Sequence, residues 1–91
     1  MYSGKIALIH NGIIENQSQL KSYLEMKGYS FKSDTDTEVL VQLISHIYYN
    51  EKLSFVKSIQ SALKRVIGAY GIVVFNLDDP ERLVAARHGS P

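Results

Sequence analysis

The stretch Ile6–Asn16, IALIHNGIIEN, decides how the first part of this chain folds. An apolar run, Ile6–Ile9, leads directly into His10, Asn11 and Gly12, and two isoleucines follow. Asn-Gly between apolar runs is a strong signal for a two-residue hairpin turn, because both residues tolerate positive φ. Alternatively, the Asn11 side-chain amide and the Gly12 backbone N–H are two neutral donors of the kind that stabilise an oxyanion. This stretch alone favours the turn and leaves the second interpretation open.

The composition is that of an ordinary globular chain and bounds the possible functions. Its 91 residues form one domain at most, or part of one, with 45% hydrophobic and 21% charged residues. A net charge of +1 gives no basic surplus for nucleic acid. No apolar segment reaches the roughly 18 residues that cross a bilayer, and no signal-peptide core is present. We therefore expect a cytoplasmic protein that binds neither nucleic acid nor membrane.

Metal and disulfide chemistry are not expected. The chain has no cysteine, which excludes disulfides and thiolate ligands. Its three histidines, His10, His46 and His88, show no ligand spacing to one another or to paired carboxylates. We expect no metal and no cofactor.

The first half of the chain predicts a strand, a helix and a short extended piece. The unbroken apolar run in Lys5–His10 is typical of a strand buried on both faces. Asn16 can cap the helix, with Gln19 in the position of a capping box, and Gly28 stands where a left-handed residue ends a helix. The segment Tyr29–Lys32 then reads as a short strand. The helix presents one apolar stripe: Leu20, Tyr23 and Leu24.

A second helix has a clearer start. Thr35 and Glu38 form the spacing of a capping box, and Asp34 and Asp36 place negative charge at the positive end of the helix dipole. A polar break, Asn50–Lys52, ends this helix. Its predicted buried face is Leu40, Leu43, Ile44 and Ile47.

The remaining residues predict a third helix and a hairpin. Ser54 can cap the helix and Gly68 is predicted to end it. The apolar segment Tyr70–Leu77, a turn at Asp78–Glu81 and the segment Leu83–Arg87 predict two paired strands. The helix residues expected to face inward are Phe55 or Val56, Ile59, Leu63 and Val66.

This order of elements predicts an α+β fold without an internal domain boundary. A sheet of about three strands with helices leaves edges and one face open, and natural domains usually protect both. The pattern therefore predicts either part of a larger domain or a free-standing, non-catalytic module that associates through its strand edges.

Four segments together resemble the glutaminase domain of the class II glutamine amidotransferases, which are N-terminal-nucleophile hydrolases. They are HNGIIEN, DTDTEV, GAYGIVVF and AARHGSP, and the resemblance extends from Lys5 to Pro91. It implies that residues 1–91 are a partial glutamine amidotransferase type 2 domain, a fragment of a four-layer αββα sandwich. The IIEN and AARHGSP segments are more similar to the sugar-phosphate aminotransferases than to the amidophosphoribosyltransferases. The latter continue the first motif with NL and follow the hairpin with Arg-Asp-x-x-Gly-Ile-Arg-Pro.

The resemblance implies roles for three residues. Asn11 and Gly12 match the family's oxyanion hole, which reverses the preference for a turn stated above, although a sharp bend could still present both donors. Asp36 matches the carboxylate that holds the substrate α-amino group. His10 matches no catalytic role. The family's nucleophile is an N-terminal cysteine, which this chain lacks, so we expect the chain alone to be inactive.

The resemblance also implies partners. These are glutamine, in the intact domain, and the remainder of the same chain, including a sugar-phosphate isomerase domain. The family resemblance further implies a homo-oligomer.

Overall fold

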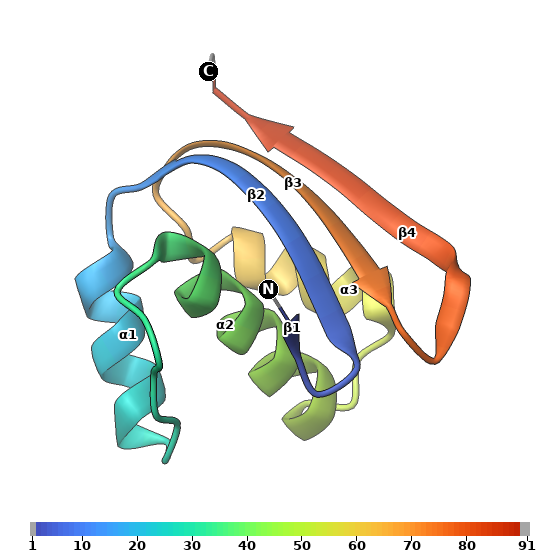
Figure 1. The fold of residues 1–91 in the computed structure, drawn as a ribbon, viewed down its shortest axis with the longest axis horizontal. Helices are drawn as coiled ribbons and strands as arrows, with labels where there is room; N and C mark the ends of the chain where they lie inside the picture. Colours follow the sequence, from blue (N-terminus) through green and yellow to red (C-terminus); the bar gives the residue numbers. More distant parts are fainter. Residues whose placement is uncertain (1, 90–91) are drawn as a thin grey trace.

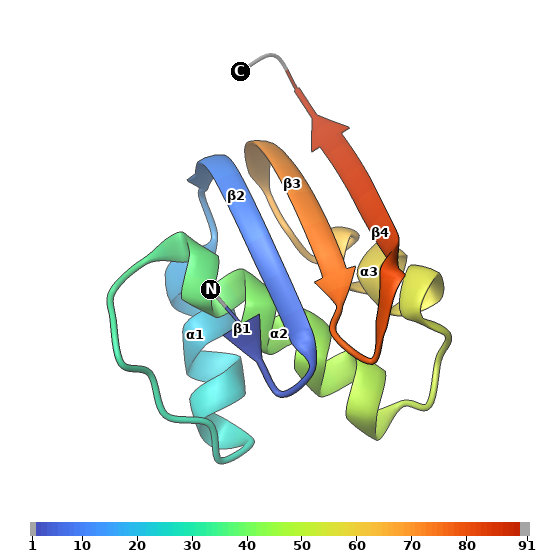
Figure 2. The ribbon, with the colours of Figure 1, turned by 45° about the vertical axis from the view of Figure 1, so that its right-hand side comes forward.

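Three helices cover one face of an antiparallel sheet, as Figure 1 shows for the computed structural model. The structure describes residues 2–89. Within them the sheet order is β1-β2-β3-β4. The turned view in Figure 2 shows all three helices on the same side of the sheet. The elements are β1 (Tyr2–Ser3), β2 (Ile6–Ile14), α1 (Gln17–Met26), α2 (Asp36–Asn50), α3 (Phe55–Leu63), β3 (Gly68–Asn76) and β4 (Asp79–His88).

The central pair of the sheet is β2 with β3, although α1, α2 and α3 separate them in sequence. The two strands pair along their whole length, from Ile6 opposite Asn76 to Ile14 opposite Gly68. β4 continues the sheet and forms a hairpin with β3. The register of the β3–β4 pairing shifts between Phe75 and Asn76. The predicted hairpin and the α+β fold class are confirmed.

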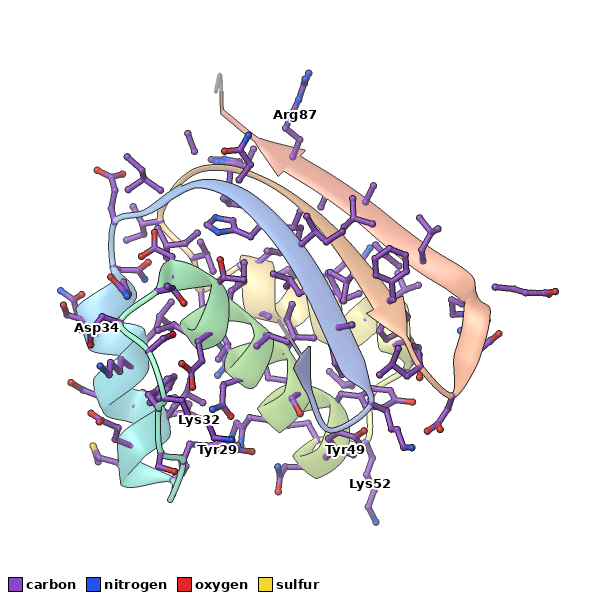
Figure 3. The ribbon with its side chains drawn as sticks, viewed as in Figure 1. Tyr29, Lys32, Asp34, Tyr49, Lys52 and Arg87 are labelled. Carbon is purple, nitrogen blue, oxygen red and sulfur yellow. The ribbon has the colours of Figure 1, made fainter. Side chains whose placement is uncertain are left out.

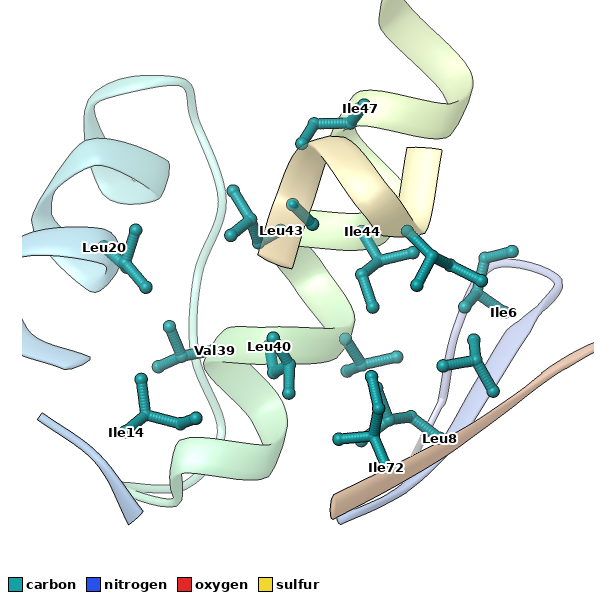
Figure 4. Packing of buried hydrophobic residues seen from close by; sticks show 14 of the residues in the cluster. Ile6, Leu8, Ile14, Leu20, Val39, Leu40, Leu43, Ile44, Ile47 and Ile72 are labelled. Atoms are coloured by element: carbon teal, nitrogen blue, oxygen red, sulfur yellow. The ribbon is translucent and has the colours of Figure 1, made fainter. Parts of the chain in front are cut away.

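The core lies between the sheet and the three helices, and α2 contributes most of its helical residues. Inward side chains alternate along β2 and β3, because a strand turns successive residues to opposite faces. In Figure 4 the strand residues Ile6, Leu8 and Ile72 lie beside α2. The buried face of α2 includes Leu40, Leu43 and Ile44. Burying this apolar surface, at about 25 cal/mol per Å², is the main stabilising contribution. The strand residues concerned are Ile6, Leu8, Ile14, Tyr70, Ile72 and Val74.

The other face of the sheet is apolar and uncovered in residues 2–89. Ile9 is 63% exposed, Ile13 69% and Leu83 55%. The expectation that Lys5–His10 is buried on both faces is therefore wrong for the described part of the chain. We call Ile9, Ile13 and Leu83 the outer sheet face.

Three local signals for helix ends are confirmed. The Thr35 hydroxyl accepts from the Glu38 N–H at 3.3 Å, and the Ser54 hydroxyl accepts from the Lys57 N–H at 3.2 Å. Gly28 follows α1 with φ of 98°, the left-handed conformation that glycine adopts without strain.

Asn16 occupies the predicted N-cap position of α1, but the capping bond expected of its side chain is missing. Instead its Nδ2 donates to the Arg65 carbonyl at 2.7 Å, and its Oδ1 accepts from the Ile67 N–H at 2.9 Å. The Glu15 N–H also donates to the Ile67 carbonyl at 2.7 Å. Asn16 therefore fastens the end of β2 to the segment that enters β3.

Other element boundaries also differ from the predictions. Residues 29–32 form no strand, because no partner strand lies beside them. The third helix ends at Leu63, and Gly68 instead begins β3. In that helix Phe55 is buried and Val56 is 40% exposed. The hairpin turn lies at residues 77–78, and β4 already begins at Asp79. The two-residue strand β1 was not predicted.

No helix within residues 2–89 is long and apolar enough to cross a membrane.

Candidate functional site

Four segments of distinctive sequence meet at one end of the sheet. Asn11 lies opposite Gly71 in the β2–β3 ladder, and Gly12 lies opposite Tyr70. Tyr70 in turn lies opposite His88 of β4. The start of α2 joins them, because Asp36 contacts β2. Residues 90 and 91 of the AARHGSP segment lie outside the described residues.

Asn11 offers an unused amide on the exposed side of the sheet. It lies on β2 between Ile9 and Ile13 in the alternation, so its side chain shares the outer sheet face with them. The residue is exposed, and its side chain has no hydrogen bond to any residue that the structure describes. A neutral N–H donor is therefore available to a ligand at this position.

Gly12 does not form the hairpin turn, because β2 continues through Asn11 and Gly12 to Ile14. Its backbone φ of 117° is a value that residues with a Cβ rarely adopt. A Cβ at this position would lie 2.3 Å from the Ala69 carbonyl oxygen and 2.7 Å from the Tyr70 Cα. Glycine is thus required by the close approach of β3, in addition to any role toward a ligand.

Asp36 stands at the first residue of α2 and faces β2. Its Oδ2 accepts a hydrogen bond from the Ile14 N–H at 2.9 Å. Its Oδ1 accepts none from residues 2–89, so half of the carboxylate is free to bind a cation. The helix dipole favours this negative charge at the N-terminus of α2.

His10 connects the same two elements. Its Nδ1 lies 3.2 Å from the Thr37 Oγ1, and its Nε2 is buried without a hydrogen-bond partner among the described residues. Burial lowers the pKa of the imidazole, and the nearby Asp36 carboxylate opposes this shift only in part. The ring is therefore neutral at physiological pH.

Glu38 organises the loop that leads to Asp36. Its carboxylate accepts from the Lys32 N–H at 2.8 Å, and from the Ser33 N–H and hydroxyl, both at 2.7 Å. The predicted capping box is thus only half formed, since Glu38 does not bond the Thr35 N–H. Burial favours the neutral acid, but the bonds from Ser33 and Lys32 outweigh it and lower the pKa of Glu38.

The loop before α2 also contacts α1. Lys21 Nζ lies 3.5 Å from Asp34 Oδ1, and Gln17 donates to the Asp34 carbonyl at 2.8 Å. Figure 3 shows Asp34 beside α1, where the loop bends toward the start of α2. These contacts and those of Glu38 hold the backbone on which Asp36 sits.

Two aromatic rings lie at the β3–β4 side of the site. Tyr70 is buried and stacks on His88 with ring centroids 5.8 Å apart, and His88 Nδ1 lies 3.0 Å from the Gly68 carbonyl oxygen. Burial raises the pKa of the Tyr70 hydroxyl. The neighbouring Arg87 points away from the helices, as Figure 3 shows.

The arrangement offers hydrogen-bond donors and a carboxylate oxygen to a ligand. It presents the Asn11 amide, the Gly12 backbone and the free oxygen of Asp36, and the chain has no cysteine. Among residues 2–89 no cluster of three His, Cys, Asp or Glu side chains could hold a metal ion.

Two residues named in the sequence analysis have roles there that differ from those in the structure. Local spacing predicts a helix cap for Asn16 and the reciprocal half of a capping box for Glu38. Asn16 bonds residues 49 and 51 positions away, which no local pattern predicts. Its place at the end of the HNGIIEN segment was the available signal.

Comparisons with known proteins identify relatives over nearly the whole chain. The model of the glutamine amidotransferase domain family matches residues 1–90. The glutamine–fructose-6-phosphate aminotransferase (isomerizing) of Bacteroides thetaiotaomicron is 53% identical over 98% of this chain. That of Chlorobaculum tepidum is 54% identical, also over 98% of this chain. The chain spans 14% and 15% of the lengths of these two relatives.

Solved structures share the fold. The glutamine phosphoribosylpyrophosphate amidotransferase from B. subtilis, complexed with ADP and GMP, covers 96% of this chain with a TM-score of 0.77 and 31% identity. This chain covers 18% of that one. A structure described as the allosteric regulatory enzyme of purine biosynthesis covers 79% of the chain, with a TM-score of 0.70 and 35% identity, and this chain covers 15% of it. From the family match over residues 1–90, the chain belongs to the glutamine amidotransferase domain family.

Proposed function

We propose that this chain is part of the glutaminase domain of a glutamine–fructose-6-phosphate aminotransferase. The parent would hydrolyse glutamine at this site and pass the ammonia to fructose 6-phosphate, which yields glucosamine 6-phosphate. The relatives that bear this name are 53% and 54% identical to the chain. The structural observation that carries the proposal is the exposed, unbonded amide of Asn11 beside Gly12, on a strand that also contacts Asp36.

The proposed chemistry assigns each group one task. A nucleophile supplied by the parent outside these residues adds to the carboxamide carbon of glutamine, and negative charge develops on the carboxamide oxygen. The Asn11 Nδ2–H and the Gly12 N–H donate to that oxygen. The C–N bond then breaks, and the nitrogen takes up the proton that the nucleophile gave up and leaves as ammonia. Water then hydrolyses the acyl group left on the nucleophile, which releases glutamate and regenerates the nucleophile. Asp36 binds the α-ammonium group of glutamine through its free oxygen and so orients the substrate.

A second candidate is the glutaminase domain of an amidophosphoribosyltransferase. The similarity to the B. subtilis structure supports it, but that identity of 31% is well below the 53% and 54% of the fructose-6-phosphate aminotransferases. Acceptor specificity of the parent distinguishes them. Glutamine-dependent amination of fructose 6-phosphate supports the first proposal, and amination of phosphoribosylpyrophosphate supports the second.

The remaining parts of the proposal concern the parent. We infer that residues 1–91 are a partial domain and that the parent contains a sugar-phosphate isomerase domain. The chain spans only 14% and 15% of the length of its two relatives, which supports a longer parent. The homo-oligomer and the cytoplasmic location stay predictions.

The test is the kinetics of glutamine hydrolysis by the intact parent carrying Asn11→Ala. Loss of one oxyanion donor should lower kcat by about 10²–10³, with little change in KM, because the bond forms mainly in the transition state. Sugar isomerisation with added ammonia serves as the control for folding. Unchanged glutamine hydrolysis in Asn11→Ala would show that this amide is not an oxyanion donor.

A further inference from the structure

His10 is the exception on the inward face of β2. The other buried residues on this face, Ile6, Leu8 and Ile14, are aliphatic. His10 instead places two ring nitrogens in the space between the sheet and α2. Only Nδ1 has a partner, the Thr37 hydroxyl, while Nε2 is buried without one among residues 2–89.

This imidazole costs free energy that an aliphatic side chain would avoid. Burial lowers its pKa, so the ring is neutral and carries a single N–H. Whichever nitrogen holds the proton, Nε2 remains a buried polar atom without a hydrogen bond, which is destabilising. Such an atom in a native fold calls for an explanation, and a functional role is one of the few available.

The bond to Thr37 joins the neighbours of two proposed substrate contacts. His10 precedes Asn11 on β2, and Thr37 follows Asp36 on α2. A second bond, from the Ile14 N–H to Asp36, connects the same two elements. These two bonds add to the packing of α2 on the sheet and set the position of the first turn of α2 relative to β2.

We propose that His10, through Thr37, is a positioning residue that sets the oxyanion donor Asn11 relative to the ammonium ligand Asp36. This inference rests on the proposed function. The carboxamide and the α-amino group of glutamine are joined by a short chain, so the two sites must keep a matching separation. A misplacement of about 1 Å can lower a rate by as much as 10²-fold.

The experiment compares isosteric variants in the intact parent. Thr37→Val removes the hydroxyl at nearly constant shape, and His10→Phe keeps a ring but removes both nitrogens. Each should lower kcat for glutamine hydrolysis by about tenfold with little change in KM, because Asp36 keeps its bond to Ile14. Thr37→Ser keeps the hydroxyl, so its kcat for glutamine hydrolysis should equal that of the unchanged parent. The double variant should be no slower than either single variant, since both remove one interaction.

A matched control separates positioning from stability. Ser58 is a buried hydroxyl on α3 that donates to the Ser54 carbonyl at 2.8 Å, away from the site. Ser58→Ala should lower the melting temperature and leave kcat unchanged. A normal kcat in folded Thr37→Val and His10→Phe would overturn the inference. If Asn11→Ala is also without effect, the proposed function itself fails; if Asn11→Ala alone is impaired, only the positioning role is wrong.

Discussion

The backbone N–H of Ile14 donates to Oδ2 of Asp36 at 2.9 Å and thereby attaches the first turn of α2 to the end of β2. One carboxylate oxygen serves the fold, and the other is left for a ligand. Structure and proposed substrate binding therefore share one side chain. This division makes the two roles of Asp36 experimentally separable.

Replacing Asp36 by Asn in the parent should raise KM for glutamine and largely spare kcat. The amide oxygen can still accept from Ile14, but the amide cannot pair with an α-ammonium group. Lost binding that is equal in the ground and transition states appears in KM. Steady-state kinetics measure this. Glu25→Gln removes one negative charge from an exposed residue of α1 and is the control. A fall in kcat with constant KM would contradict the assignment.

Gly12→Ala should destabilise the parent by about 1–3 kcal/mol, because φ of 117° and the Ala69 carbonyl both oppose a Cβ. Gly71→Ala, across the same ladder, meets no atom within 4 Å and should be close to neutral. Denaturant unfolding of both variants tests this difference. Equal stability of the two variants would mean that β2 and β3 can move apart at Gly12 with little loss of folding free energy.

Glu38 should contribute acid-sensitive stability. Its pKa is lowered in the folded state from an ordinary value of 4.5, so its contribution is complete above that value. The contribution is lost as the pH falls below 4.5 through the lower folded pKa. Glu38→Gln should flatten this part of the stability profile, measured as melting temperature against pH. An equally steep loss of melting temperature below pH 4.5 in Glu38→Gln would contradict this assignment.

The 91-residue chain by itself should release no ammonia from glutamine above a buffer blank. Donors and an ammonium ligand without a nucleophile cannot complete a turnover, and the chain has no cysteine. Ammonia release that disappears in Asn11→Ala would refute this expectation.

The same chain should self-associate through its outer sheet face. Ile9, Ile13 and Leu83 expose apolar surface that a second copy can cover. Sedimentation over a range of concentrations should show dimers or larger species, and Ile9→Lys with Leu83→Lys should reduce them. A monomer at every concentration would argue against this.

Local sequence determined the features whose partners lie within one helical turn. Thr35 and Ser54 cap their helices as predicted, and Gly28 ends α1, because each acts on backbone groups a few residues away. The alternation and length of the apolar runs likewise determined the β3–β4 hairpin and the buried face of α2. The four motifs were sufficient to identify the family, since that inference needs residue types and spacing alone.

Tertiary structure decided what depended on distant partners. Asn11-Gly12 has the local chemistry of a turn, yet the strand continues, because its pairing with β3 extends to Ile14. Asn16 has the chemistry of a cap, yet it bonds Arg65 and Ile67, which only folding brings near. The sequence of residues 29–32 is typical of an extended segment, yet these residues form no strand. A strand needs a neighbouring strand that supplies hydrogen bonds.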